Sequence, residues 1–159
     1  LNKYGGLYVD TDFECIKKIP ENLLEKSFLT SIIFNEAPQF CNAMIMAKPD
    51  NFLIKAIISS LTIPKDENNP INIIEATGPG PLTREYFKLT PSQKANCLIL
   101  PTNYFYPYPN FYLTNNEKII NSYTKEISIG IHHWQMSWTK GNLMERIKRK
   151  IVYIINSKK

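Results

Sequence analysis

Two carboxylates, Asp10 and Asp12, stand two residues apart directly after a short apolar run, residues 7–9. The run is partly β-branched and predicts a buried strand, which leaves both carboxylates at its carboxyl end. In open α/β sheets this end of a strand is where ligands bind. Two hard oxygen ligands close together suit Mg²⁺ or Mn²⁺, which usually keep other coordination positions for water and substrate phosphates. The spacing therefore predicts a site for a metal ion and a phosphate-bearing substrate.

Three other interpretations of this pair compete with the metal-phosphate site. An EF-hand calcium loop needs glycine at its sixth position and a helix in front. Cys15 fills that position, Pro20 falls inside the loop and a strand leads in, so the calcium interpretation fails. A phosphatase of the haloacid dehalogenase type also has Asp-x-Asp after a buried strand, but it requires threonine where this chain has Glu14. The last interpretation is a solvated acidic turn that closes a hairpin.

The residues around the two carboxylates form a longer pattern. Residues 4–12 read Tyr-Gly-Gly-Leu-Tyr-Val-Asp-Thr-Asp. This stretch resembles the YGG-x-Y-x-D-x-D signature of glycosyltransferase family 32, and every specified position is filled. The resemblance implies a GT-A-type, Rossmann-like α/β domain in which Mn²⁺ (or Mg²⁺) bridges the diphosphate of a UDP- or GDP-sugar. It implies that Asp12 binds the metal directly, that Asp10 binds either a water on the metal or a hydroxyl of the donor, and that Tyr4 and Gly6 belong to the substrate site.

A second group of candidate site residues follows a predicted strand near the end of the chain. Residues 131–138 resemble the closing H-x-W…SW segment of the same family. By that resemblance His132 is a candidate third metal ligand, with His133 as the alternative, and Trp134 and Trp138 wall the donor site. An isolated histidine is more often structural than a ligand. The two tryptophans can also close the hydrophobic core over a short loop, and both roles can hold together.

Three further positions match elements of the family. Asn42 precedes an apolar stretch, and its amide could bind sugar hydroxyls or simply cap a turn. Thr77 and Gly78 begin a Thr-Gly-Pro sequence that resembles the family's TGP element. A helix N-terminus there would point free N–H groups at an anion or a hydroxyl. The family also has a Pro-x-x-x-Phe-Tyr-Pro segment, matched by residues 101–107 inside an aromatic run that we interpret as packing on the domain.

Alternating short strands and helices must position these residues, and they predict an α/β domain. Strands are expected over residues 7–9, 27–34, 42–47, 95–100 and 127–131, with extended chain over 13–16. Helices are expected over 51–61 with Asp50 as N-cap, over 82–88 after a stiff turn at 76–81, and over 142–156. Residues 1–3 read as the end of a helix, 20–26 as a short turn or helical piece, and 35–41 and 63–70 as loops. No internal repeat or long linker divides the chain, so residues 1–159 are expected to form a single domain.

Length and composition are ordinary for a globular protein. The chain has 159 residues, of which 43% are hydrophobic and 21% charged. No apolar run reaches the roughly 18 residues that cross a bilayer. Three widely spaced cysteines form neither a disulfide framework nor a CxxC metal pattern. The net charge of +5 suits anionic substrates or membrane surfaces, but it is not the pattern of a nucleic-acid-binding protein.

The basic segment 141–159 is expected to be an amphipathic helix that packs on the domain. It could also lie on anionic lipid, which would suit a lipid-linked acceptor. The expected partners are a nucleotide-sugar donor and a glycan or lipid-linked acceptor, with peripheral membrane contact and no nucleic acid. The expected location is cytoplasmic with membrane association, or the Golgi lumen if the chain belongs to a longer eukaryotic protein.

The resemblance runs in islands from Tyr4 to Trp138. Members of the family have a nucleotide-binding half before the YGG, and this chain starts after it. We therefore expect the chain to be either the C-terminal part of such a transferase or a degenerate relative of the family, and expect it to bind nucleotide sugar poorly on its own. The resemblance implies retention of anomeric configuration, and no residue is assigned as nucleophile or base. The alternative function, from another class, is a non-catalytic sugar- or partner-binding fragment.

Overall fold

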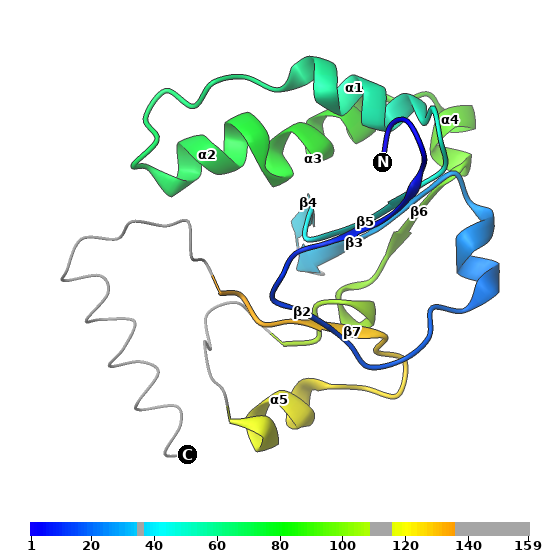
Figure 1. Cartoon of the computed structure of the whole chain (residues 1–159), viewed down its shortest axis with the longest axis vertical. Helices are drawn as coiled ribbons and strands as arrows, with labels where there is room; N and C mark the ends of the chain where they lie inside the picture. Colours follow the sequence, from blue (N-terminus) through cyan, green and yellow to red (C-terminus); the bar gives the residue numbers. More distant parts are fainter. Residues whose placement is uncertain (35–36, 109–115, 136–159) are drawn as a thin grey trace.

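A computed structural model describes residues 1–34, 37–108 and 116–135, and these residues form a mixed α/β fold (Figure 1). The larger sheet has the strand order β1-β5-β3-β4, and β6 also pairs with β3. Within the part of the chain that is described, only the β3–β6 pair is parallel, and the other pairs of this sheet are antiparallel. Strands β2 and β7 form a separate antiparallel pair. The α/β class is therefore confirmed, while the finer prediction of a GT-A-type, Rossmann-like domain stays a prediction.

The elements follow one another along the chain with short connections. They are β1 (Gly6–Val9), β2 (Phe13–Cys15), the 3₁₀ helix η1 (Glu21–Glu25), β3 (Phe28–Phe34), β4 (Ala37–Phe40), β5 (Met44–Ala47), α1 (Phe52–Ser60), α2 (Pro70–Thr77), α3 (Pro79–Lys88), α4 (Pro91–Ala95), β6 (Cys97–Leu100), the 3₁₀ helix η2 (Thr102–Tyr104), α5 (Glu117–Tyr123) and β7 (Gly130–His132). Figure 1 shows α1 to α3 on one side of the larger sheet, and β2, β7 and α5 on the other.

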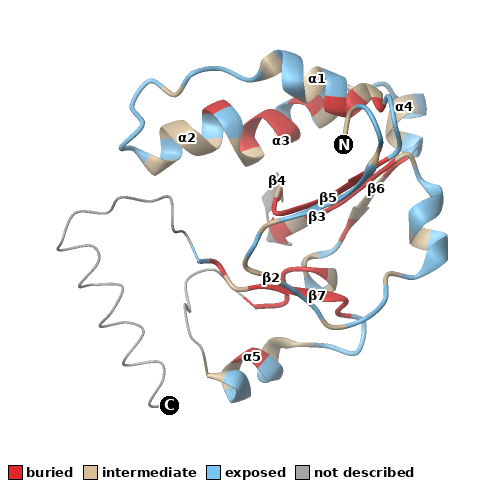
Figure 2. Ribbon diagram, viewed as in Figure 1, coloured by how far each residue is buried: buried red, intermediate tan, exposed pale blue. Residues whose placement is uncertain are grey.

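The larger sheet separates two clusters of buried side chains, as the alternation of strand side chains requires. In β5 all four residues are buried; Met44 and Met46 face one cluster, Ile45 and Ala47 the other. The helical side holds Phe28, Phe40, Ile45, Leu53, Ile54 and Leu82. The opposite side holds Leu29, Met44, Met46, Phe105, Tyr106, Tyr108, Ile131 and Trp134. Figure 2 shows this buried centre along β3, β5 and β7.

The aromatic run after β6 belongs to the second of these clusters. Phe105, Tyr106 and Tyr108 are almost fully buried there. The interpretation of this run as packing on the domain is therefore confirmed as far as Tyr108, beyond which residues 109–115 lie outside the description.

The first strand differs from its prediction. A buried strand was expected at 7–9, but the side chains of Leu7, Tyr8 and Val9 are 49%, 46% and 41% exposed. The reason is the position of β1 at the end of the strand order, where β5 is its only partner among the described strands. An apolar run alone does not distinguish a central strand from an edge strand.

The start of α1 also differs by one residue from its prediction. Asn51, not Asp50, is the N-cap, and its side chain accepts hydrogen bonds from the backbone N–H groups of Leu53 and Ile54. Asp50 instead has a left-handed backbone with φ of 58° and pairs with Lys55 at 3.0 Å. Both residue types cap helices well, so only the backbone conformation decides between them.

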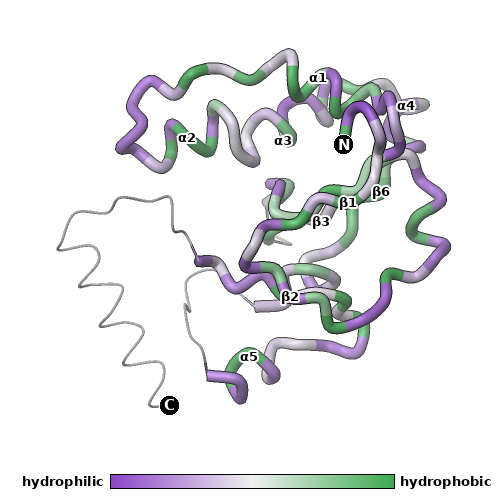
Figure 3. Tube along the Cα trace, in the orientation of Figure 1, coloured by the Kyte–Doolittle hydropathy of each residue, from purple (hydrophilic) through white to green (hydrophobic). Residues whose placement is uncertain are grey.

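Several local assignments are corrected. The expected loop at 35–41 contains β4, because residues 37–40 fold back antiparallel onto β3. Residues 1–3 lie in a turn rather than at the end of a helix, and the stiff turn at 76–81 shrinks to Gly78, the residue between α2 and α3. Helices α2, α4 and α5 were not predicted. The predicted loop at 63–70 is correct up to Asn69, and Figure 3 shows its hydrophilic character between α1 and α2.

The predicted helix at 142–156, the basic segment 141–159 and Trp138 lie outside the described residues. Among the helices that are described, none combines the length and the apolar character needed to cross a bilayer.

Gly5, just before β1, and Gly6, its first residue, provide a test of how the chain enters the sheet. Gly5 has φ of +65°, and a Cβ built on it would lie 2.8 Å from the carbonyl oxygen of Ala47 and 2.7 Å from Cδ of Pro49. Gly6 has φ of +106° with no atom within 4 Å of such a Cβ. We expect Gly5→Ala to lower the free energy of unfolding by about 2–4 kcal/mol, since strain and overlap add. Gly6→Ala adds strain alone and should cost about 1–3 kcal/mol. Urea unfolding of both variants measures the difference, and equal losses would contradict the overlap.

Candidate metal centre

The Asp10–Asp12 segment connects the two sheets. At the end of β1 the backbone N–H of Asp10 donates to the carbonyl oxygen of Ala43 at 2.8 Å, which continues the pairing with β5. The chain then turns, with the N–H of Phe13 donating to the Asp10 carbonyl oxygen at 3.1 Å, and enters β2. Phe13 is paired with His132 of β7. Asp12 and His132, 120 positions apart, therefore meet where the two sheets join.

One ligand atom each from Asp10, Asp12 and His132 lies within 4.8 Å of the others. The Nε2 atom of His132 lies 3.2 Å from Oδ1 of Asp12 and 3.7 Å from Oδ2 of Asp10. The Asp12 side chain is 12% exposed and the Asp10 side chain 36% exposed. The cluster thus has a covered inner part, Asp12 with His132, and a more accessible outer carboxylate.

The carboxylate of Asp12 is held from two sides. Its Oδ2 atom accepts a hydrogen bond from the backbone N–H of Gln135 at 2.6 Å, and Oδ1 faces His132. The carbonyl oxygen of Asp12 also accepts from the backbone N–H of His133 at 3.0 Å. Both the side chain and the backbone of Asp12 are therefore oriented by the residues that follow β7.

The carboxylate of Asp10 has a partner on its own strand. The Tyr8 hydroxyl donates to Oδ1 of Asp10 at 2.7 Å, since residues two apart lie on the same side of a strand. This hydrogen bond to the Asp10 carboxylate, helped by partial burial, raises the pKa of Tyr8 to about 12. Tyr8 remains a neutral hydrogen-bond donor that leaves Oδ2 of Asp10 facing His132.

His132 lies among aromatic rings. The ring centroids of Trp134, Tyr106 and Phe13 are 4.3, 5.9 and 6.3 Å from that of His132. Burial in this environment lowers the pKa of His132, and the nearby carboxylates of Asp12 and Asp10 oppose the shift only in part. The imidazole is therefore neutral at pH 7, the form in which it binds metals.

The donor set fits a divalent cation. Carboxylate oxygens together with one imidazole nitrogen suit ions such as Mn²⁺. Mg²⁺ also binds carboxylate oxygens. Metal–oxygen distances of about 2.1 Å require neighbouring donors roughly 3–4 Å apart. The observed group, within 4.8 Å, needs only a small contraction to reach this spacing. A cation there would also attract the Asp10 and Asp12 carboxylates, which both face the neutral His132 imidazole.

The lowered pKa of His132 predicts a pH dependence of stability. In the unfolded chain this histidine titrates near 6.5, and in the folded protein it titrates lower. Below about pH 6.5 the unfolded state therefore binds the proton first, so we expect the free energy of unfolding to decrease as the pH falls from 7 toward 5.5. Urea unfolding across this range measures the effect, and His132→Gln should remove part of the decrease. His133→Gln is the matched control and should keep it; the same decrease in both variants would contradict the assignment.

The neighbouring histidine faces away from the cluster. Nε2 of His133 lies 2.9 Å from Oε2 of Glu14, whose residue is paired with Ile131 in the β2–β7 ladder. Successive strand residues point to opposite sides, which explains why His132 and not His133 joins Asp10 and Asp12. Of the two histidines, the metal-ligand prediction made for His132 agrees with the geometry.

The predicted substrate-binding residues are dispersed. Asn42 lies in the turn beside Ala43, close to the carboxyl end of β1. Tyr4 is highly exposed in the turn before β1, and Gly6 begins that strand. Thr77 ends α2, where its hydroxyl donates to the Ile73 carbonyl oxygen, and Gly78 joins α2 to α3 in the helical layer (Figure 1). Their roles in substrate binding stay predictions.

Trp134 is part of the second core cluster and is only 8% exposed. Its indole N–H donates to the carbonyl oxygen of Tyr108 at 2.7 Å. The interpretation of this tryptophan as closing the core agrees with the structure, and its predicted contact with the donor stays a prediction.

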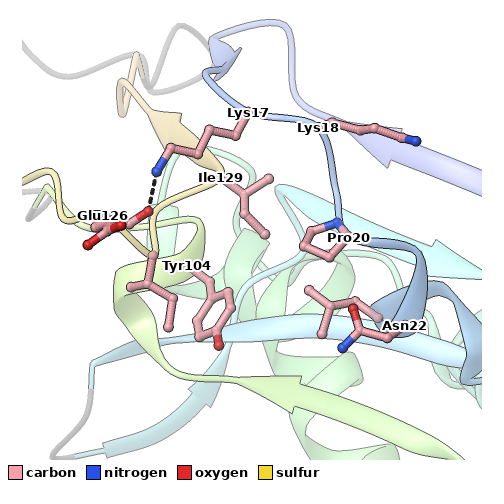
Figure 4. Close-up of a pocket in the computed structure, with 9 residues that line it drawn as sticks. Lys17, Lys18, Pro20, Asn22, Tyr104, Glu126 and Ile129 are labelled. Atoms are coloured by element: carbon pink, nitrogen blue, oxygen red, sulfur yellow. Dashed lines mark hydrogen bonds between the residues drawn. The ribbon is translucent and has the colours of Figure 1, made fainter.

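A hollow of about 260 Å³ lies at the other end of the β2–β7 ladder. Its lining includes Lys17, Lys18, Pro20, Tyr104 and Ile129, and Figure 4 shows the Lys17 ammonium group donating to the carbonyl oxygen of Glu126. Lys18 is paired with Glu21. Because both ammonium groups already have partners, this hollow adds no clear anion site to the candidate metal centre.

Sequence reasoning missed two groups that hold the carboxylates. Tyr8 could have been found, because a tyrosine two residues before Asp10 must lie on the same side of the strand. The backbone N–H of Gln135 could not, since a main-chain donor has no residue-type signal.

Searches of protein-family models, of curated proteins and of solved structures find no match to this chain.

Proposed function

We propose that this chain is a metal-dependent glycosyltransferase domain that moves a hexose from a nucleoside-diphosphate sugar to a glycan or lipid-linked acceptor. The observation that carries the proposal is the convergence of Asp10, Asp12 and His132 within 4.8 Å. The choice of glycosyl transfer among metal-dependent reactions rests on the sequence, where residues 4–12 fill every specified position of the YGG-x-Y-x-D-x-D pattern. Asp10 and Asp12 enter both arguments, whereas the position of His132 beside them comes from the structure and lies outside residues 4–12.

Asp10, Asp12 and His132 have different proposed roles at the metal site. Asp12 and His132 form its covered anchor, because Asp12 is fixed by the Gln135 N–H and His132 is held among aromatic rings. Asp10 is more exposed and could bind the metal through water or accept a hydrogen bond from a donor hydroxyl. A bound Mn²⁺ or Mg²⁺ would supply positive charge that stabilises the departing nucleoside diphosphate without a proton. Asn42 precedes Ala43, whose carbonyl oxygen accepts the hydrogen bond from the Asp10 N–H. From this position the Asn42 amide could contact sugar hydroxyls.

The remaining parts of the proposal follow from the resemblance. Tyr4, Gly6, Thr77, Gly78, Trp134 and Trp138 are proposed as further donor contacts, with UDP- or GDP-sugar as donor and retention of the anomeric configuration. Peripheral membrane contact through residues 141–159 is proposed for a lipid-linked acceptor. No nucleophile or general base is assigned.

One observation favours a second candidate, a non-catalytic partner-binding module. Strand β1 leaves apolar side chains exposed at the end of the sheet, and an unpaired strand edge can pair with another chain.

The test is a titration of the chain with Mn²⁺, followed by titrations of UDP, GDP and their hexose conjugates with Mn²⁺ or with EDTA. We expect one Mn²⁺ site by calorimetry and weak nucleotide-sugar binding that requires the metal. Asp10→Asn should weaken both, whereas Asp66→Asn, in an exposed loop, should change neither. No Mn²⁺ binding by the wild-type chain would exclude the metal-dependent transferase and favour the partner-binding module. Metal-dependent hydrolysis of a simple aryl phosphate would instead support the phosphatase.

A further inference from the structure

Trp134 has a strained backbone directly beside the candidate metal centre. Its φ is +57°, in the left-handed region that large side chains rarely adopt. Among the described residues the only other non-glycine with positive φ is Asp50, an exposed residue of a type that tolerates this conformation. A strained conformation at a buried tryptophan persists only where the surrounding contacts hold it, and such residues concentrate at functional sites.

Two kinds of contact hold Trp134 in this conformation. The indole N–H donates to the Tyr108 carbonyl oxygen at 2.7 Å, in a fully buried position. The indole ring packs against His132 with a centroid distance of 4.3 Å and against Tyr106 at 5.7 Å. The hydrogen bond fixes the direction of the side chain and the ring contacts fix its position. Together they stabilise the turn that ends β7.

This turn determines where the next backbone N–H points. The N–H of Gln135 donates to Oδ2 of Asp12 at 2.6 Å, while the N–H of His133, on the other side of Trp134, donates to the Asp12 carbonyl oxygen at 3.0 Å. A hydrogen bond to an ionised carboxylate is among the stronger and more directional ones. With Oδ2 occupied in this way, Oδ1 of Asp12 is left facing Nε2 of His132 at 3.2 Å.

We propose that Trp134 is a positioning residue for the metal centre: its indole–Tyr108 hydrogen bond holds the left-handed turn that aims the Gln135 N–H at Asp12 and sets Oδ1 of Asp12 and Nε2 of His132 as a preformed ligand pair. This inference rests on the proposed metal site. Trp134 thereby affects two of the proposed ligands. It orients Asp12 through the Gln135 N–H, and it orients His132 through ring packing.

The experiment measures Mn²⁺ affinity by calorimetry for the full chain and four variants. Trp134→Phe keeps an aromatic ring but loses the indole N–H, and we expect it to bind Mn²⁺ about 10- to 100-fold more weakly, as for other residues that orient metal ligands. Tyr106→Phe is the matched control, because it removes a hydroxyl of the same cluster but keeps the ring that packs against Trp134; its affinity should be unchanged. Trp134→Gly and Trp134→Ala both lose the ring, but only glycine adopts the left-handed turn without strain. Trp134→Gly should therefore bind Mn²⁺ more tightly than Trp134→Ala even though both are less stable.

A second measurement tests the positioning role without metal. In the metal-free protein the Gln135 amide proton should resonate downfield because of its short hydrogen bond to Asp12, and Trp134→Phe should move it upfield. Unchanged Mn²⁺ affinity and an unchanged Gln135 resonance in folded Trp134→Phe would overturn the positioning role and leave the proposed function standing. If wild-type protein binds no Mn²⁺, the proposed function fails, and the Gln135 resonance alone then decides whether Trp134 orients Asp12.

Discussion

Replacing Asp12 by asparagine should abolish measurable Mn²⁺ binding while leaving the fold intact. Asparagine has nearly the same shape, and its amide oxygen can still accept the hydrogen bond from the Gln135 N–H. Its NH₂ group would then occupy the position of Oδ1, facing Nε2 of His132, and would repel a cation. Because changes in residues that merely orient metal ligands cost about 10- to 100-fold in affinity, we expect a loss of more than about 100-fold here. Calorimetric titration with Mn²⁺ measures it.

A metal-free measurement accompanies the Asp12→Asn result. The Asp12 carboxylate opposes the lowering of the His132 pKa, so its removal should lower that pKa further, which an NMR titration of the His132 ring detects. Asp50→Asn is the matched control, because it also converts an aspartate to its amide but removes only an exposed ion pair with Lys55. Its Mn²⁺ affinity should be unchanged, and its stability should change by less than about 1 kcal/mol. Wild-type Mn²⁺ affinity in Asp12→Asn would show that the Asp10–Asp12–His132 group is not the metal site.

The second large effect is expected from Gly130→Ala in β7. A Cβ atom on Gly130 would overlap the ring of Phe13, with Cζ at 2.6 Å, and would lie 3.2 Å from the Glu14 carbonyl oxygen. Because β2 is hydrogen-bonded to β7, its backbone cannot easily shift, and the Phe13 ring must move instead. We expect a loss of about 1–3 kcal/mol in the free energy of unfolding. Urea unfolding measures it.

The displaced ring should also affect the metal centre. Phe13 follows Asp12 directly and packs against His132, with ring centroids 6.3 Å apart. We therefore expect Gly130→Ala to weaken Mn²⁺ binding as well. The control is the double variant Gly130→Ala with Phe13→Leu, since leucine lacks the ring atoms that overlap. If steric overlap is the cause, the double variant loses less stability than the sum of the two single changes. Strict additivity would contradict this explanation.

Local pattern was sufficient for the central strands and for the first helix. The apolar runs that became β3, β5 and β6 were predicted because strands buried on both faces read as continuous apolar segments. The helix at 51–61 was predicted from its apolar spacing, although its N-cap was placed one residue too early. Pattern failed at β4, whose strand exists because residues 37–40 pair with β3, and at α2 and α4. Both of these helices begin with a side-chain N-cap followed by proline at the first helical position. This combination is a sequence signal for a helix start.

Part of the candidate site could likewise be predicted from the sequence, and part depends on the tertiary structure. The sequence alone determined that Asp10 and Asp12 lie together after a strand, because residues two apart cannot separate, and it singled out His132 as a candidate third ligand. The tertiary structure alone decided that His132 meets them, because the pairing of β2 with β7 brings Asp12 to a residue 120 positions later. It also decided that β1 lies at an exposed edge, that Gln135 donates to Asp12, and that Trp134 adopts a left-handed turn. The physical reason is that periodicity within a segment fixes which side chains share a face, whereas strand neighbours and main-chain donors depend on the packing of the whole chain.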